Sequence, residues 1–377
     1  MRVLFASVPA VGHLFPLVPF AWAFRAVGHE VLVASAEHTG RAADCGLQVV
    51  DVAPGYSALA VLQQLPQDHP ELLESFGNQT LPVDPTPWAP VFAAINRPLV
   101  DRTMDLVDDW RPDLVVYEQV ATYGLLAAAR AGVPAIQRNL GVYTSGRMHQ
   151  ETAGHLADVC ARYGISDLPT PAGVLEFMPP SMLPREPEGW FTRYVPPGGG
   201  LLGDRLPERP DRPRIVVTMG TNAPRFYGLG TVAKVIAAAS TVDAEFVVAL
   251  GDVDPAPLGE LPSNVRTVGW MPLAALLRTA VGVVHHGGGG TAMAAIDAGI
   301  PQLIVLDPMD GTQQTTGDAV RERGIGLTTT PDEIDATLLK QLLTDDAMRR
   351  ASAEVRDEMA ALPSPAQLVP RLAALAS

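Results

Sequence analysis

Four consecutive glycines at positions 287–290 place the strongest constraint on how this chain folds. They follow an apolar pair and two histidines, His285 and His286, and they lead into Thr291 and a helical pattern. A turn without β-carbons lets backbone N–H groups approach an anion closely, and the positive end of the helix that starts near Thr291 faces the same point. The run predicts a phosphate-binding turn, to which His286 and Thr291 add donors. The plainer alternative is a flexible turn.

The residues around the turn place it inside a β-α-β unit. A short helical pattern over 292–298 is ended by Gly-Ile-Pro, and the apolar run over 302–306 is typical of a buried parallel strand. Before the turn, a strand over 265–269 ends at Trp270, and a short helix over 273–279 leads back. An aromatic ring beside a phosphate-binding turn indicates a nucleotide.

These motifs resemble the donor-binding signature of the GT-B family-one glycosyltransferases. The resemblance rests on Gly-Trp-Met-Pro-Leu at 269–273, the His-His-Gly-Gly-Gly-Gly-Thr run at 285–291 and Ala-Gly-Ile-Pro-Gln at 298–302. Within that family the chain is most similar to actinobacterial enzymes that attach deoxysugars to antibiotics, and 56–98 is the region that matches least. The resemblance implies an α/β fold of two facing Rossmann-like, doubly wound domains with a cleft between them. It also implies an inverting, metal-independent transfer from a nucleotide sugar held mainly by the second domain.

Composition limits the class of protein. A chain of 377 residues is long enough for two domains, and 47% hydrophobic residues fit a soluble globular protein. The net charge of −14 gives no basic surface for nucleic acid, so anion binding has to be local and built from backbone dipoles. The two cysteines, Cys45 and Cys160, are expected to be ordinary thiols, which favours a cytoplasmic protein.

The uncharged stretch between Arg2 and Arg25 could be a signal peptide or a membrane helix. Prolines, a glycine and a histidine interrupt it, so a strand, a turn and an amphipathic helix are the preferred interpretation. We expect no transmembrane span and no membrane partner.

Repeated apolar runs separated by helical patterns predict two domains. The first domain, 1–195, is assigned to the acceptor, 196–213 to the linker at the end of a Pro/Gly-rich segment over 179–213, and 214–362 to the nucleotide-sugar donor. The expected strands are 3–6, 30–34, 47–52, 114–117 and 135–137, then 214–219, 245–250, 264–269, 281–285, 302–306 and 326–328. Pro363-Ser364-Pro365 starts a last helix within 363–377, which by the resemblance returns to the first domain.

Ligands bind beyond the carboxyl ends of parallel strands, so residues there are the catalytic candidates. The first strand leads to His13, which occupies the position of the general base in the family motif; a structural histidine is the alternative. A catalytic histidine usually needs a carboxylate partner. Glu118 stands directly after the fourth strand, where the family usually has Asp, and it could instead contact the acceptor or be a solvated loop residue.

The donor site is expected to use the phosphate-binding turn and three further segments. By the resemblance, Gly220 and Thr221 face the pyrophosphate and the sugar, although Gly-Thr-Asn is also an everyday turn. Trp270 is the candidate to stack on the base, with Met271 and Leu273 reading its edge; the alternative is a core tryptophan. The complete donor set is Gly220, Thr221, Trp270, Met271, Leu273, His286, Gly288, Gly289, Gly290, Thr291, Asp310, Gln313 and Gln314.

Two departures from the family pattern bear on the donor. Ala294 stands where enzymes that use ribonucleotide sugars commonly have a glutamate for the ribose hydroxyls, which favours a dTDP-sugar over UDP-glucose. The Asp/Glu-Gln pair that faces the sugar is represented by Asp310, but Gly311 replaces the glutamine. Either Gln313 or Gln314 substitutes from a longer loop, or the donor carries fewer hydroxyls.

The acceptor side is the least defined. Phe15 and Tyr143, with proline and aromatic residues over 56–92 and the stretch 143–155, could form an apolar cavity for a hydrophobic aglycone, or could be loop packing. The identities of the sugar and aglycone, and an O- or C-glycosidic bond, stay open. A homodimer is compatible with the sequence, which marks no self-complementary surface.

Other enzyme classes fit less well. The only Gly-x-Gly-x-x-Gly match, 198–203, lies in the linker, neither lysine follows a glycine as a P-loop requires, and eight histidines lack metal-ligand spacing. No cofactor and no metal are expected. Two alternatives stay open: a catalytically inactive auxiliary partner of a glycosyltransferase, and a nucleotide-sugar epimerase of the same fold.

Overall fold

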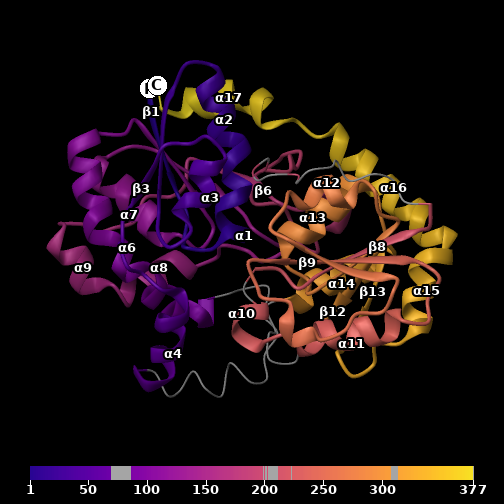
Figure 1. The fold of residues 1–377 in the computed structure, drawn as a ribbon. Coiled ribbons are helices and arrows are strands. Elements are labelled where there is room, and N and C mark those ends of the chain that lie inside the picture. The colour runs from indigo at the N-terminus through magenta and orange to yellow at the C-terminus, as the bar shows by residue number, and fades with distance from the viewer. Residues whose placement is uncertain are drawn as a thin grey trace.

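The computed structural model describes residues 1–68, 86–197, 199, 202, 211–221, 223–306 and 313–376. Two parallel sheets organise this part of the chain, one in each half (Figure 1). The strand orders are β3-β2-β1-β4-β5-β6-β7 and β10-β9-β8-β11-β12-β13. The first six strands of each order follow the same pattern, as expected for two doubly wound domains.

The strands of the first sheet are β1 (Arg2–Ala6), β2 (Glu30–Ser35), β3 (Val49–Asp51), β4 (Leu114–Glu118), β5 (Ala135–Arg138), β6 (Gly173–Glu176) and β7 (Trp190–Phe191). Those of the second are β8 (Arg214–Thr218), β9 (Glu245–Gly251), β10 (Val265–Gly269), β11 (Gly282–His285), β12 (Gln302–Val305) and β13 (Gly326–Thr329).

The helices of the first half are α1 (Val11–Leu14), α2 (Val18–Ala26), α3 (Thr39–Asp44), α4 (Ala58–Asp68), α6 (Ala89–Trp110), α7 (Thr122–Ala131), α8 (Met148–Gly154) and α9 (Ala157–Arg162). Those of the second half are α10 (Ala223–Tyr227), α11 (Gly230–Ala239), α12 (Leu273–Leu277), α13 (Gly289–Ala298), α14 (Gln314–Glu322), α15 (Ala336–Thr344), α16 (Asp346–Ala361) and α17 (Pro365–Ala373).

The central strands are apolar on both faces because helices cover both sides of each sheet. On β1, Leu4 and Ala6 pack into one buried cluster, whereas Val3 and Phe5 pack into another with Phe20 of α2. Successive side chains of a strand point to opposite faces, so an uninterrupted apolar run fits a strand covered twice. The uncharged N-terminal stretch thus forms β1 and α2 of the first core, as the strand–turn–helix interpretation predicted.

The last helix, α17, packs on the first domain. Ser364 and Gln367 form a capping box at its start, and Leu368, Val369 and Leu372 join the cluster that contains α2. In Figure 1 the yellow α17 lies beside the indigo α2. The chain therefore returns to its first half after finishing the second.

Two strands at the edge of the first sheet escaped the sequence analysis. β6 was not expected, and β7 lies inside the Pro/Gly-rich segment over 179–213, so that segment is not a linker throughout. β7 pairs with β6 through two residues only, and a Cβ at Gly189 would lie 2.0 Å from the Val174 carbonyl oxygen. A glycine that resembles a turn signal is required here for the close approach of two strands.

Both cysteines are free, as expected: Cys45 is buried and Cys160 is partly buried. Over the described ranges, no helix combines the length and apolar character that crossing a bilayer requires.

Candidate active site

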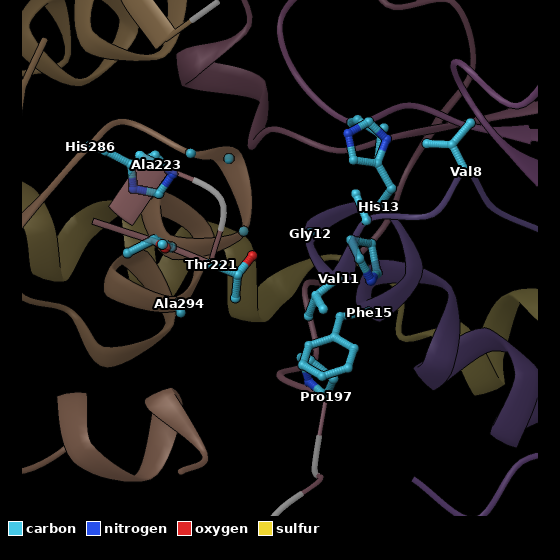
Figure 2. Close-up of a pocket in the computed structure, with 18 of the residues that line it drawn as sticks. Val8, Val11, Gly12, His13, Phe15, Pro197, Thr221, Ala223, His286 and Ala294 are labelled. Carbon is cyan, nitrogen blue, oxygen red and sulfur yellow. The ribbon is translucent and has the colours of Figure 1, made fainter. Parts of the chain in front are cut away.

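A cavity of about 610 Å³ lies between the two sheets and is lined by residues of both domains. Figure 2 shows His13 and Phe15 on one side of it and Thr221 and His286 on the other. The turns after β1, β8 and β11 all contribute, which is the edge at which parallel sheets bind ligands.

His13 and Glu118 form a pair on the first-domain side. The Nδ1 atom of His13 lies 3.3 Å from Oε2 of Glu118, and the two side chains are 34% and 0% exposed. The Glu118 carboxylate also accepts two backbone hydrogen bonds, from Val8 N–H to Oε1 at 3.1 Å and from Val120 N–H to Oε2 at 2.9 Å. A buried carboxylate held by two N–H groups has a fixed place, and it stands where it can stabilise a cationic imidazole.

The orientation of the His13 ring follows from this pairing. Its Nδ1 atom is buried at ion-pair distance from the carboxylate, without a hydrogen bond among the described residues, so the exposed part of the side chain lies elsewhere. This leaves Nε2 as the nitrogen that can face the cavity. Because Glu118 ends β4 next to β1, its longer side chain still reaches the histidine from the position where an aspartate was expected.

The glycine turn is partly helical. Gly287 has a φ of +89°, Gly288 is the extended N-cap, and α13 begins at Gly289, two residues earlier than expected. The Gly288 carbonyl accepts the N–H groups of Thr291 and Ala292 at 3.0 Å each. The N–H groups of Gly289 and Gly290 open the helix and have no intrahelical partner, so they are free to bind an anion.

Two glycines make room for the His286 ring. A Cβ at Gly220 would lie 2.4 Å from Cε1 of His286, and a Cβ at Gly288 would lie 2.5 Å from its Nε2. Gly220 also has a φ of +71°. The imidazole thus stands between the first turn of the second domain and the N-cap of α13, beside the free N–H groups.

The buried side chain of His285 holds the start of the glycine turn in place through hydrogen bonds. Its Nδ1 accepts the Gly287 N–H at 3.1 Å, and its Nε2 donates to Oε1 of Gln302 at 2.9 Å. Burial, together with the neighbouring His286, lowers the pKa of His285 to about 3. The ring is therefore neutral at physiological pH and acts as both donor and acceptor, which suits a structural support.

Trp270 lies where the two domains meet. The Arg41 guanidinium of α3 lies 3.8 Å from the centroid of its ring, and the ring of Phe15 meets it edge-on at 6.2 Å. Arg41 also forms an ion pair with Asp252 at 2.6 Å. Trp270 lines the cavity and is only partly buried, so it is not a simple core residue.

Comparison with known proteins places these features in a family. Residues 22–220 match the N-terminal domain and residues 233–375 the C-terminal domain of the family described as erythromycin biosynthesis protein CIII-like. The chain belongs to this family. It is 37% identical to the elloramycin glycosyltransferase ElmGT of Streptomyces olivaceus, over 99% of this chain and 97% of that protein.

Solved structures agree. The glycosyltransferase SnogD from Streptomyces nogalater superposes with a TM-score of 0.85 at 36% identity, covering 100% of this chain and 99% of that one. The glycosyltransferase VinC, solved in complex with dTDP, superposes with a TM-score of 0.79 at 28% identity over 100% and 99%. The chain is thus a family-one glycosyltransferase with the GT-B fold of two facing Rossmann-like domains, and the expected fold and enzyme class are confirmed.

Most residues that the sequence proposed for the site of this glycosyltransferase lie together on the cavity. They are His13, Phe15, Tyr143, Gly220, Thr221, Trp270, Met271, Leu273, His286, Gly288, Gly289, Gly290, Thr291 and Gln313. Gln314 is turned away, since its Nε2 donates to Oδ1 of Asp318 at 3.0 Å within α14. Asp310 lies outside the described residues.

The part of the cavity that the first domain lines is largely apolar. Besides Phe15 and Tyr143, its lining includes Tyr56, Leu62, Trp88, Val91, Phe92, Ile95 and Met148. The aromatic residues that the sequence left as either cavity or loop packing therefore face this space.

Three residues of the glycosyltransferase site were not anticipated: His285, Arg41 and Gln119. Gln119 lines the cavity, donates to the Tyr143 carbonyl at 3.1 Å and accepts the Leu140 N–H at 3.1 Å. The sequence around Arg41 does not indicate that it lies at the site, because its partners Trp270 and Asp252 belong to the other domain. Among the residues described, no group of three or more His, Cys, Asp or Glu side chains could hold a metal ion.

Proposed function

We propose that this glycosyltransferase moves a deoxysugar from a dTDP-sugar to a hydrophobic natural-product aglycone, a polyketide or similar antibiotic, with inversion at the anomeric carbon. One observation carries the proposal: the His13–Glu118 pair faces the glycine turn of α13 across a single cavity. A base and an anion site on opposite walls suit a displacement in which the acceptor enters from one side and a diphosphate leaves on the other.

The leaving group is held by the second domain. The N–H groups of Gly289 and Gly290, the positive end of α13, His286 and Thr291 surround the place assigned to the diphosphate. Fixed dipoles aimed at a developing charge supply much of the stabilisation of a transition state. They supply it here without a metal ion. Gly220, Thr221, Asp310 and Gln313 are assigned to the sugar and its pyrophosphate, whereas Gln314 is bonded to Asp318 within α14.

His13 is the general base. Its Nε2 takes the proton from the acceptor, the acceptor atom bonds to the anomeric carbon, and the bond from that carbon to the diphosphate oxygen breaks with its electron pair leaving on dTDP. Glu118, 3.3 Å from Nδ1, stabilises the imidazolium that forms. The attack comes from the face opposite the leaving group, so the configuration inverts.

The donor nucleotide is assigned from Ala294. This residue is 4% exposed and lines the cavity, and its methyl group cannot hydrogen-bond a ribose 2′-hydroxyl. A deoxyribonucleotide, which has no 2′-hydroxyl, loses less by that absence than a ribonucleotide does. The dTDP complex of the relative VinC supports the same choice.

The apolar half of the cavity favours transfer over epimerisation. An epimerase needs room for its nucleotide sugar only, whereas here Trp88, Phe92, Ile95 and Met148 line additional space on the first-domain side. That space suits a hydrophobic acceptor.

Mass spectrometry of the purified protein, incubated with dTDP-sugars and candidate aglycones, tests the proposal. The expected product is an aglycone with one added deoxysugar, formed together with dTDP. Sugar isomerised without an acceptor would indicate the epimerase instead. No product with any pair, while dTDP binds, would indicate the auxiliary protein.

A further inference from the structure

Arg138 differs from the other buried arginines of this protein. It ends β5 and is 2% exposed, and in the described ranges no carboxylate lies within ion-pair distance of it. The side chains of Arg185 and Arg214 are only 7% and 6% exposed, but they form ion pairs with Glu176 at 3.0 Å and with Glu245 at 2.8 Å. Arg138 donates through Nη1 to the Asn139 carbonyl, and its Nε has no hydrogen-bond partner among the described residues.

Aromatic rings surround the Arg138 guanidinium. Its central carbon lies 4.8 Å from the ring centroid of Phe177 and 6.0 Å from that of Phe20. Cation–π contacts offset part of the cost of burying a charge, but they do not neutralise it. Burial lowers the pKa of Arg138 to about 10, so the side chain stays positive at neutral pH. Glu176 also favours the charged form of Arg138, but its ion pair is with Arg185, so Arg138 itself has no ion-pair partner among the described residues.

One of these rings, that of Phe177, also lies beside the start of α13. A Cβ at Gly289 would lie 3.1 Å from Cε1 of Phe177 and 3.0 Å from the Leu140 carbonyl oxygen. The hydroxyl of Tyr194, which lies near Arg138, is 3.5 Å from the Gly290 carbonyl oxygen. One ring, that of Phe177, thus separates the guanidinium from the turn assigned to the diphosphate.

We propose that Arg138 is the counter-charge of the donor diphosphate: a cation of the first domain that stabilises, through the ring of Phe177, an anion bound by the second domain. The inference rests on the proposed function, since it needs a diphosphate at Gly289 and Gly290. Arg138 touches no substrate, so it is a positioning residue. In an interior of low polarity, charges interact over longer distances than in water, so one intervening ring does not cancel the attraction.

This role has a structural consequence. Because Arg138 and the glycine turn belong to different domains, a bound diphosphate draws them together, whereas a nucleoside without phosphate does not. The contribution of Arg138 to affinity should therefore grow with the charge of the ligand.

The test measures the binding of thymidine, dTMP and dTDP to the full-length protein by calorimetry. In Arg138→Met, thymidine should bind as in the wild type, dTMP more weakly, and dTDP weakest relative to wild type, by about tenfold or more. Arg138→Lys keeps the charge and should retain most of the dTDP affinity. Arg162→Met removes a charge from the exposed face of α9, where the side chain is 52% exposed, and should leave all three affinities unchanged.

Thermal unfolding provides a second readout. Replacing an unpaired buried cation by an apolar side chain of similar length should not lower the unfolding temperature of the free protein. Arg138→Gln provides a second neutral variant. If both neutral variants fail to fold, the cation is compensated within the free protein and the inference is wrong.

An equal loss of thymidine and dTDP affinity in Arg138→Met, or no loss of either, would also overturn the inference. A wild-type protein that binds dTDP no better than thymidine would instead contradict the proposed function. The two failures are therefore distinguishable.

Discussion

The turns after β1 and β4 in the first domain occupy the same topological place as the turns after β8 and β11 in the second. In both sheets these strands are neighbours, and the order of the chain reverses between them. Open parallel sheets bind ligands at such a point. The first domain places His13 and Glu118 there, whereas the second places glycines and His286.

The two places differ in what their backbone N–H groups bind. In the first domain the Val8 and Val120 N–H groups, from the turns after β1 and β4, both donate to Glu118. In the second, the first N–H groups of α13 have no intrahelical partner. One domain fills its anion site with its own carboxylate, and the other leaves it open for a ligand. The fold places the two sites opposite each other. The residues on the turns then suit the first site to proton transfer and the second to anion binding.

The largest expected effect comes from removing the base. His13→Ala should lower turnover by at least about a hundredfold, because a general base contributes roughly 10² to 10⁴ in rate, while dTDP binding stays nearly intact. Steady-state kinetics and a dTDP titration measure the two. His155→Ala, which removes an exposed histidine of the same domain, is the matched control. A parallel loss of dTDP affinity would contradict the division between the domains.

Glu118→Gln tests whether the first anion site must hold an anion. Glutamine offers one oxygen where the carboxylate offers two, so its amide nitrogen would face a backbone N–H donor, and the charge beside His13 is lost. Turnover should fall by about 10- to 100-fold, and the unfolding temperature should also fall. Unchanged kcat in a folded variant would show that His13 works without a carboxylate.

Gly288→Ala tests the second site. A Cβ there would lie 2.5 Å from Nε2 of His286 and displace the ring, so dTDP should bind about tenfold more weakly, the scale expected for losing a hydrogen bond to a charged group. Gly230→Ala, at the start of α11 and away from the cavity lining, is the control, because nothing lies within 4 Å of its Cβ position. Calorimetry with dTDP distinguishes the two variants. Unchanged dTDP affinity in Gly288→Ala would mean that the placement of His286 does not matter for binding.

The sequence predicted the two domains and the residues on each turn because their signals are local. Apolar runs mark the central strands, and a histidine or a glycine run directly after a strand marks the site. β7 could not be predicted, because its two-residue pairing with β6 depends on tertiary contact at Gly189. The start of α13 was placed too late, since glycines are weak helix formers and the N-cap depends on the Gly288 carbonyl.

Two arginines that the sequence analysis did not single out, Arg41 and Arg138, have partners that are distant in the sequence. Arg41 meets Trp270 and Asp252 across the domain boundary, and Arg138 meets the rings of Phe20 and Phe177. The surroundings of Arg41 depend on the association of the two domains, whereas those of Arg138 depend on the packing of the first domain. From the sequence, anion binding was attributed to backbone dipoles, His286 and Thr291, and Arg138 was not included.

The smallest expected effect concerns Ala294 of the second domain. We proposed that this residue favours a donor with deoxyribose over one with ribose. dUDP and UDP differ only in the 2′-hydroxyl, so the ratio of their affinities isolates the contribution of the ribose. Ala294→Ser adds one hydroxyl to the cavity wall and should lower the preference for dUDP by about two- to tenfold, the range of one hydrogen bond. Ala298→Ser, on the same helix but away from the cavity lining, should leave the ratio unchanged. If the wild type prefers UDP over dUDP, the methyl group of Ala294 is not the selector, and the second domain recognises its donor through the base and diphosphate alone.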